Sequence, residues 1–137
     1  MALVTGVLLV GVLGIFHHIA LRTLDRLTGR DLVRPNLSVI GILLGLLIIH
    51  TIEILLFAGA YAVLLDWPGM GGFSGDFDPG WESVIYYSGI NFTTLGYTQL
   101  EVTGSLRIIS MMQSLGGFMV LTWSATFIYS AWEKAFR

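Results

Sequence analysis

The chain has 137 residues, of which 55% are hydrophobic and 12% are charged, and its mean hydropathy is +0.79. Soluble domains have about 25% charged residues, so water is not the main solvent of this protein. The formal net charge of -2 says little by itself, but nothing in the sequence resembles the basic surface that nucleic-acid binding needs. Without cysteine, the chain has neither disulfides nor thiolate metal sites. We therefore expect an integral membrane protein.

Three apolar stretches are long enough to cross a bilayer, whose hydrocarbon layer is roughly 30 Å thick and needs about 20 helical residues. They cover residues 1–21, 37–65 and 106–132. No positive charge precedes the first stretch and no small-residue cleavage site follows it, so we expect a retained helix in place of a signal peptide. The sequence thus predicts an all-α, multi-pass membrane protein in contact with the lipid bilayer.

Basic residues are concentrated in two segments, a loop at 22–36 and a tail at 133–137. Short segments rich in lysine and arginine stay on the cytoplasmic side of a membrane. Because three crossings place both segments on one side, we predict a cytoplasmic C-terminus and an external N-terminus, in the inner membrane of a bacterial or archaeal cell. The loop at 66–78 then lies outside and contributes to an acidic mouth formed by Asp66, Asp76, Asp78, Glu82 and Glu101.

A shorter apolar and aromatic segment at 79–93 follows a helix-start signal, Asp78-Pro79, but is too short to cross the bilayer. Non-helical backbone at membrane depth is tolerated only where protein covers it or where it lines a watery cavity. A short helix followed by a non-helical return to the surface is therefore expected only where the backbone has a function at that depth. An ion filter, in which backbone carbonyls line a water-filled pore, is such a function. Such a filter needs four copies of the loop, so one copy per chain implies a homotetramer.

The stretch from Val84 to Tyr97, VIYYSGINFTTLGY, resembles the pore helix and filter of the potassium channel superfamily, whose filter reads Thr-Val-Gly-Tyr-Gly. The chain is similar to small bacterial ion channel proteins that place one extra helix before a two-helix pore unit. The resemblance covers residues 37–132. It implies an outer helix at 37–65, a pore helix at 79–93, a filter at 94–98 and an inner helix at 106–132.

By this resemblance, potassium ions bind at Thr94, Leu95, Gly96 and Tyr97, with Thr98 completing the filter. A glycine at position 96 also suits a filter for a physical reason. Glycine adopts the left-handed backbone conformation at little cost, and this conformation turns neighbouring carbonyls the same way. Thr98 stands where the family has a second glycine, and Gln99 stands where the family has an acidic residue. A threonine at positive φ costs about 1 kcal/mol. Potassium-selective and nonselective filters, the latter also passing sodium, therefore both stay open.

Residues around the filter receive supporting roles from the same resemblance. Tyr86 and Tyr87 match aromatic positions that brace the filter from behind, although they also suit an aromatic belt at the membrane surface. Thr93 and Gln99 flank the filter as further support. Gly116-Gly117 falls where the inner helix of the family has a hinge glycine, and adjacent glycines weaken a helix locally. Close helix packing explains this pair equally well.

Two further positions place ionisable groups inside the apolar stretches. His50 and Glu53 are three residues apart and so lie on one face of the second helix. A carboxylate in a membrane marks a functional site by default, and we weigh a hydrogen-bonded structural pair, a proton sensor and a metal site. His17 and His18 point about 100 degrees apart and cannot chelate on one face, so we expect interfacial histidines there.

These observations predict a cation channel that passes potassium passively through a carbonyl-lined filter, without cofactors and without catalysis. No catalytic side-chain set is recognisable in a plausible wet site. Three alternatives remain: a nonselective cation channel, a proton or cation carrier that uses His50 and Glu53, and a non-conducting membrane subunit.

Overall fold

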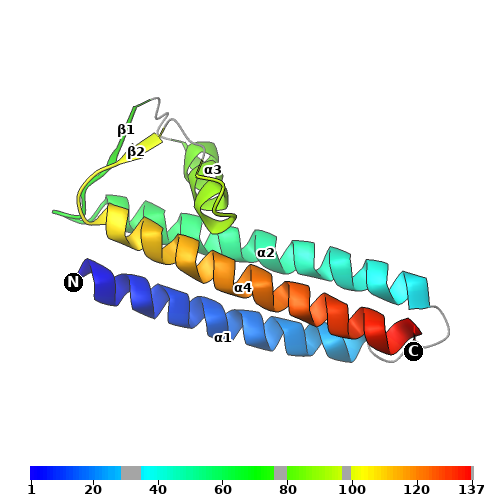
Figure 1. Ribbon diagram of the computed structural model, residues 1–137. Coiled ribbons are helices and arrows are strands. Elements are labelled where there is room, and N and C mark those ends of the chain that lie inside the picture. Colours follow the sequence, from blue (N-terminus) through cyan, green and yellow to red (C-terminus); the bar gives the residue numbers. More distant parts are fainter. Residues whose placement is uncertain (29–34, 76–79, 97–99, 137) are drawn as a thin grey trace.

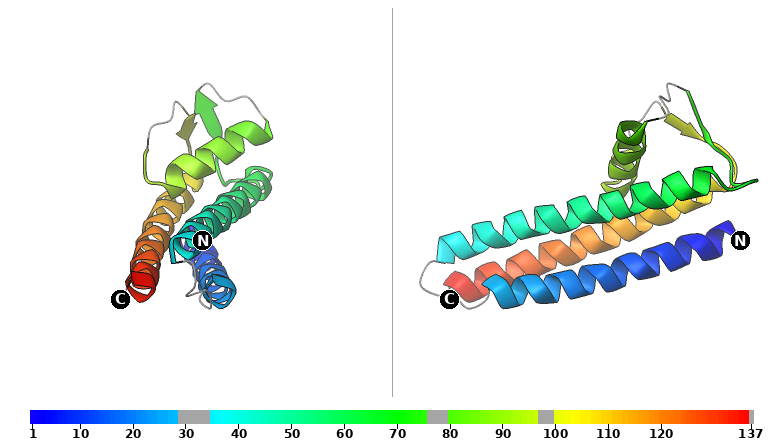
Figure 2. Two further views of the ribbon diagram at one scale, coloured as in Figure 1. Left: turned by 90° about the vertical axis from the view of Figure 1, so that its right-hand side faces the viewer. Right: turned by 180° about the vertical axis from the view of Figure 1, so that it is seen from behind.

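The computed structural model describes residues 1–28, 35–75, 80–96 and 100–136. Within these ranges three helices are long and apolar enough to cross a membrane: α1 (Ala2–Thr28), α2 (Pro35–Leu65) and α4 (Leu106–Phe136). They lie side by side, and α2 runs antiparallel to α1 and α4 (Figures 1 and 2). The N-terminus therefore lies at the end of the bundle where α2 finishes, and the C-terminus lies at the opposite end. The predicted helical membrane protein is confirmed at this level.

The long helices extend beyond the predicted apolar stretches at three boundaries, one of which is the start of α2 at Pro35 in place of residue 37. Residues 22–28 continue α1, and α4 runs to Phe136 through most of the expected tail. Arginine, leucine, lysine and glutamate propagate a helix well, and long basic side chains reach water from a helix end. In α1, Leu21 and Leu24 remain buried against Leu46 and Ile49 of α2. Packing against α2 thus supports the part of α1 that lies beyond the apolar stretch.

A fourth helix, α3 (Trp81–Phe92), and a pair of three-residue strands lie beside the bundle (Figure 1). The helix is two residues shorter at its start and one at its end than the predicted segment 79–93, and Gly80 is its N-cap. Strands β1 (Phe73–Gly75) and β2 (Leu100–Val102) pair antiparallel, with Phe73 opposite Val102. This short sheet was not predicted, but the described residues are mostly helical, as expected of an all-α membrane protein. Each strand is too short to show an alternation of apolar and polar residues. Pairing between residues 27 positions apart, such as Ser74 and Glu101, holds the strands together.

The buried core consists of two clusters of hydrophobic side chains, one in each half of the bundle. Near α3, aromatic and aliphatic side chains from all four helices pack together, including Leu13, Phe57, Tyr61, Phe92 and Ile109. Most large apolar side chains on the outer faces of the long helices are exposed, as Leu8, Leu47 and Phe118 illustrate. Exposed apolar surface on this scale fits a lipid environment, in which such surface carries no cost.

Candidate functional site

The C-terminal end of α3 reaches the middle of the bundle. The Phe92 side chain is fully buried, and its ring centroid lies 5.7 Å from that of His50, halfway along α2. On the other side, the Phe92 carbonyl sits so close to Gly117 of α4 that a Cβ atom there would overlap it. Gly117 is eleven residues into α4 from Leu106, a depth of roughly 16 Å at 1.5 Å per residue. That depth is about half of a hydrocarbon layer.

The chain enters and leaves α3 at the same end of the bundle. Strand β1 precedes α3 and strand β2 follows it, and the two strands are paired. The Leu106 amide, at the start of α4, donates a 3.0 Å hydrogen bond to the Met70 carbonyl. Phe92 thus lies at the middle of the bundle, whereas β2, which follows it in the chain, is paired with β1 beside the start of α4. The predicted short helix is present, and its re-entrant role stays a prediction.

Polar side chains that sequence reasoning missed fix α3 between α2 and α4. Ser88 donates a 2.7 Å hydrogen bond to the Ile54 carbonyl of α2. Gln113 of α4 donates from Nε2 to the Ser88 hydroxyl at 2.8 Å. The Tyr87 and Ser110 hydroxyls are 2.6 Å apart. Ser88 and Gln113 are completely buried, so these hydrogen bonds have no competition from solvent and hold α3 at a defined depth.

The two tyrosines predicted to support the filter lie in different surroundings. Tyr87 is buried, and its ring packs edge-on against Tyr61 and Phe73, at centroid distances of 5.3 and 4.6 Å. Tyr86 is 52% exposed on the outer side of α3. Tyr87 therefore braces α3 within its own chain, whereas Tyr86 is free to contact lipid or another chain.

The backbone that leaves α3 is strained. The Leu95 amide donates to the Ile90 carbonyl and the Thr94 amide to the Asn91 carbonyl, both at 3.1 Å, which is the hydrogen-bond pattern of a Schellman cap. This cap needs a left-handed residue, and Thr94 takes that place with a φ of 58°. Gly96 is left-handed as well, with a φ of 64°. Glycine accepts this conformation readily, but a β-branched residue does not.

Thr94→Gly should relieve this strain and raise the free energy of unfolding by about 1 kcal/mol. Thr93 is the matched control because its φ is −81° and its hydroxyl donates to the Gly89 carbonyl at 2.8 Å. Thr93→Gly should therefore destabilise the protein. Thermal unfolding in detergent, followed by circular dichroism, measures both. A Thr94→Gly variant that melts earlier than the parent would show that the left-handed threonine carries no strain.

Residues 93–96 are exposed, with Leu95 71% accessible, so the proposed filter backbone is uncovered within one chain. The remaining predicted filter and support residues, Tyr97, Thr98 and Gln99, lie outside the described residues. Their roles stay predictions.

Gly116 and Gly117 both lie in unbroken α4 helix and are both buried. They pack in different directions. A Cβ atom on Gly116 would lie 3.0 Å from Val10 of α1, whereas one on Gly117 would overlap the Phe92 carbonyl of α3. Close packing therefore explains both glycines, and the hinge role stays a prediction.

A buried polar cluster joins the three long helices below the end of α3. Glu53 is completely buried and interacts with two histidines. Its Oε2 lies 2.7 Å from His50 Nδ1, the partner expected from the sequence spacing, and its Oε1 lies 2.8 Å from His17 Nδ1 of α1. The imidazole rings stack at a centroid distance of 5.6 Å and an angle of 14°. Ser124 of α4 completes the cluster, with its hydroxyl 3.3 Å from His17 Nε2.

The expectation of an interfacial position is wrong for His17. This side chain is fully buried, whereas the neighbouring His18 is exposed and packs beside Trp123 at 5.8 Å. The difference follows from the rotation of about 100° between successive helical residues. His17 faces α2 and contacts the buried Glu53 carboxylate there. The sequence does not show this contact, because it depends on how the two helices pack.

Comparison of the chain with models of protein families, with curated proteins and with solved structures finds no significant match.

Proposed function

We propose that this protein is one subunit of a tetrameric cation-conducting pore, with residues 94–98 of each chain forming the filter. The supporting observation is the strained, exposed backbone at the end of α3, which lies near the middle of the bundle. Backbone strain persists where the surroundings enforce it, and it concentrates at functional sites. Left-handed residues at Thr94 and Gly96 provide the kind of alternation by which successive carbonyls can be turned toward one axis.

A tetramer is proposed because the backbone of residues 93–96 is exposed within a single chain. Backbone polar groups at membrane depth need hydrogen-bond partners or water, and lipid supplies neither. The amides of residues 93–95 donate within the end of α3, so the exposed carbonyls of this segment are the groups that need partners or water. Four copies around an axis would enclose this backbone and place it along a water-filled path. Exposed Tyr86 and Leu95 are then candidates for contacts between subunits.

Gly96→Ala should abolish cation flux because a side chain at a φ of 64° opposes the filter backbone. Gly14→Ala is the matched control, since Gly14 lies within the α1 helix and an added Cβ would meet nothing within 4 Å. Flux of potassium and of sodium is measured separately in liposomes containing the purified protein. We expect barium-sensitive flux from the parent and from Gly14→Ala. Equal flux from Gly96→Ala would contradict the proposed filter.

The same assay separates the two kinds of channel. Potassium flux without sodium flux identifies a selective filter, and equal flux of both identifies a nonselective one. Thr98→Gly, which restores the second glycine of the related filters, should shift the preference toward potassium if Thr98 is responsible for a loss of selectivity. An absence of all flux would favour a non-conducting membrane subunit.

The buried cluster gives the carrier alternative a concrete form. Glu53 lies between two histidines at the centre of the bundle, an arrangement that can hold and pass a proton. A carrier of this kind predicts that Glu53→Gln abolishes transport while Gly96→Ala leaves it intact. The pore predicts loss of flux in Gly96→Ala, so the two variants distinguish the two functions.

A further inference from the structure

We propose that His17, His50 and Glu53 form a binding site for one divalent transition-metal ion, for which zinc is the best chemical fit. The ligand atoms of these three side chains all lie within 4.8 Å of one another. They come from two different helices and face a common point at the centre of the bundle. This site is separate from the filter residues, and its existence does not depend on the proposed pore.

The donor set selects the class of metal. Two imidazole nitrogens and one carboxylate, with a fourth position left open, are a recurring set of zinc ligands in proteins. Imidazole suits zinc, copper, nickel and iron, whereas magnesium and calcium prefer oxygen ligands alone. The chain has no cysteine to favour thiolate-binding metals.

The buried Glu53 carboxylate needs a positive charge beside it, which a divalent ion or a protonated imidazole can supply. Both histidines present the same nitrogen, Nδ1, to the two oxygens of one carboxylate. Two neutral imidazoles would leave the Glu53 charge uncompensated, although its side chain is fully buried in an apolar bundle. A divalent ion compensates this charge and at the same time uses all three donors.

The surroundings of His17 suit a metal ligand. Coordination through Nδ1 leaves the imidazole proton on Nε2, where the Ser124 hydroxyl lies 3.3 Å away and can accept it. Such an outer hydrogen bond orients a metal-binding histidine and fixes its tautomer. Ser124 belongs to α4, so the metal site and its outer hydrogen bond together connect all three long helices.

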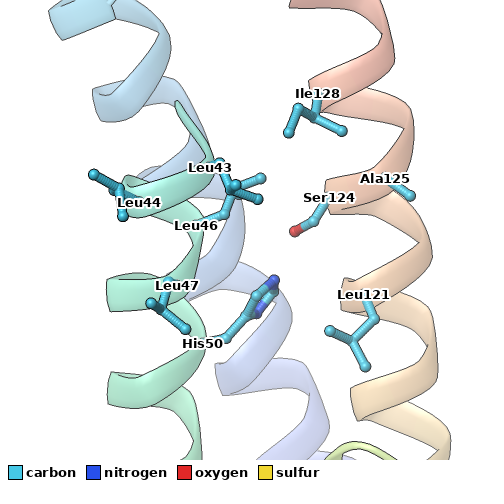
Figure 3. A pocket seen from close by; sticks show the side chains of 9 residues that line it. All are labelled: Leu43, Leu44, Leu46, Leu47, His50, Leu121, Ser124, Ala125 and Ile128. Atoms are coloured by element: carbon cyan, nitrogen blue, oxygen red, sulfur yellow. The ribbon is translucent and has the colours of Figure 1, made fainter. Parts of the chain in front are cut away.

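One ligand of the site borders a cavity. His50 is 15% exposed and lines a cavity of ≈ 480 Å³ between α2 and α4. Of the nine described residues that line this cavity, only His50 and Ser124 are polar, and their side chains point toward one another across it (Figure 3). His50 is thus the one ligand of the three that borders this cavity, and an open coordination position would face this space.

Cobalt provides a direct test because its visible absorption reports the coordinating atoms. The purified full-length chain in detergent, freed of metal with a chelator, is titrated with Co²⁺ and then with Zn²⁺. We expect one Co²⁺ per chain, with visible bands typical of nitrogen and oxygen ligands that Zn²⁺ abolishes. His18→Ala, the matched control one residue from the site, should bind as the parent does. Glu53→Gln should lose the bands.

Ser124→Ala keeps the test decisive if Glu53→Gln does not fold. Removing the outer hydrogen bond should weaken Co²⁺ binding about 10- to 100-fold and leave the ligands in place. The proposal is overturned if the parent shows no visible bands at millimolar Co²⁺. It is equally overturned if folded Glu53→Gln, or Ser124→Ala, binds Co²⁺ with the affinity of the parent. None of these measurements involves ion flux, so failure of the proposed pore would leave them unchanged.

Discussion

His17→Ala should lower the free energy of unfolding by about 3 kcal/mol, the largest stability change that we expect from a single substitution in α1. The variant removes one of the two imidazoles that interact with the buried Glu53 carboxylate, at 2.8 Å, and takes away the partner of Ser124. A buried charge that loses a partner cannot regain one from water or lipid. Thermal unfolding in detergent measures the loss.

His18→Ala is the control for this prediction because the same residue type is removed one position along the same helix. His18 is exposed, so its loss should change the free energy of unfolding by less than about 0.5 kcal/mol. Equal melting curves for the two variants would show that the cluster contributes nothing to stability. The comparison also isolates burial from helix propensity, which is identical for the two substitutions.

Gly117→Ala should destabilise the protein by about 2 kcal/mol, because overpacking against fixed backbone costs more than the improved helix propensity returns. The added methyl group would overlap the Phe92 carbonyl, so α3 must move away from α4. The hydrogen bonds between Gln113 and Ser88, at 2.8 and 3.1 Å, would be stretched by the same movement. If residues 94–98 line a pore, cation flux should fall together with stability.

Gly116→Ala tests whether the two adjacent glycines serve close packing or a hinge in α4. Its methyl group would meet the Val10 side chain at 3.0 Å, and a side chain can adjust where a carbonyl cannot. We therefore expect a change of stability within about 1 kcal/mol. A flexible hinge predicts a different result, in which both alanine variants alter channel opening while stability hardly changes. Melting curves and liposome flux, measured on the same preparations, distinguish the two explanations.

The buried cluster and the end of α3 are neighbours, since the Phe92 ring lies against His50 and Phe92 directly precedes the exposed segment. A metal ion or a proton held at Glu53 would therefore act next to the residues that position the proposed filter. Flux measured with and without Zn²⁺, in the parent and in Ser124→Ala, would show whether occupancy of the cluster influences conduction.

The sequence by itself determined the three membrane-length helices and the presence of a short helix before the last of them. These features depend on the length of apolar stretches and on local helix signals, both of which are readable along the chain. The pairing of His50 with Glu53 was also predictable, because a spacing of three residues fixes a shared helix face.

Only the tertiary structure decided which helix faces meet. The long helices are apolar on nearly all sides, so periodicity does not distinguish the buried face from the lipid-facing one. The contact of His17 with Glu53, 36 residues away, was for this reason invisible, as were the overlap that requires glycine at position 117 and the antiparallel pairing of β1 with β2. In a membrane, the position of each buried polar group depends on partners from other segments, and those partners are set by packing.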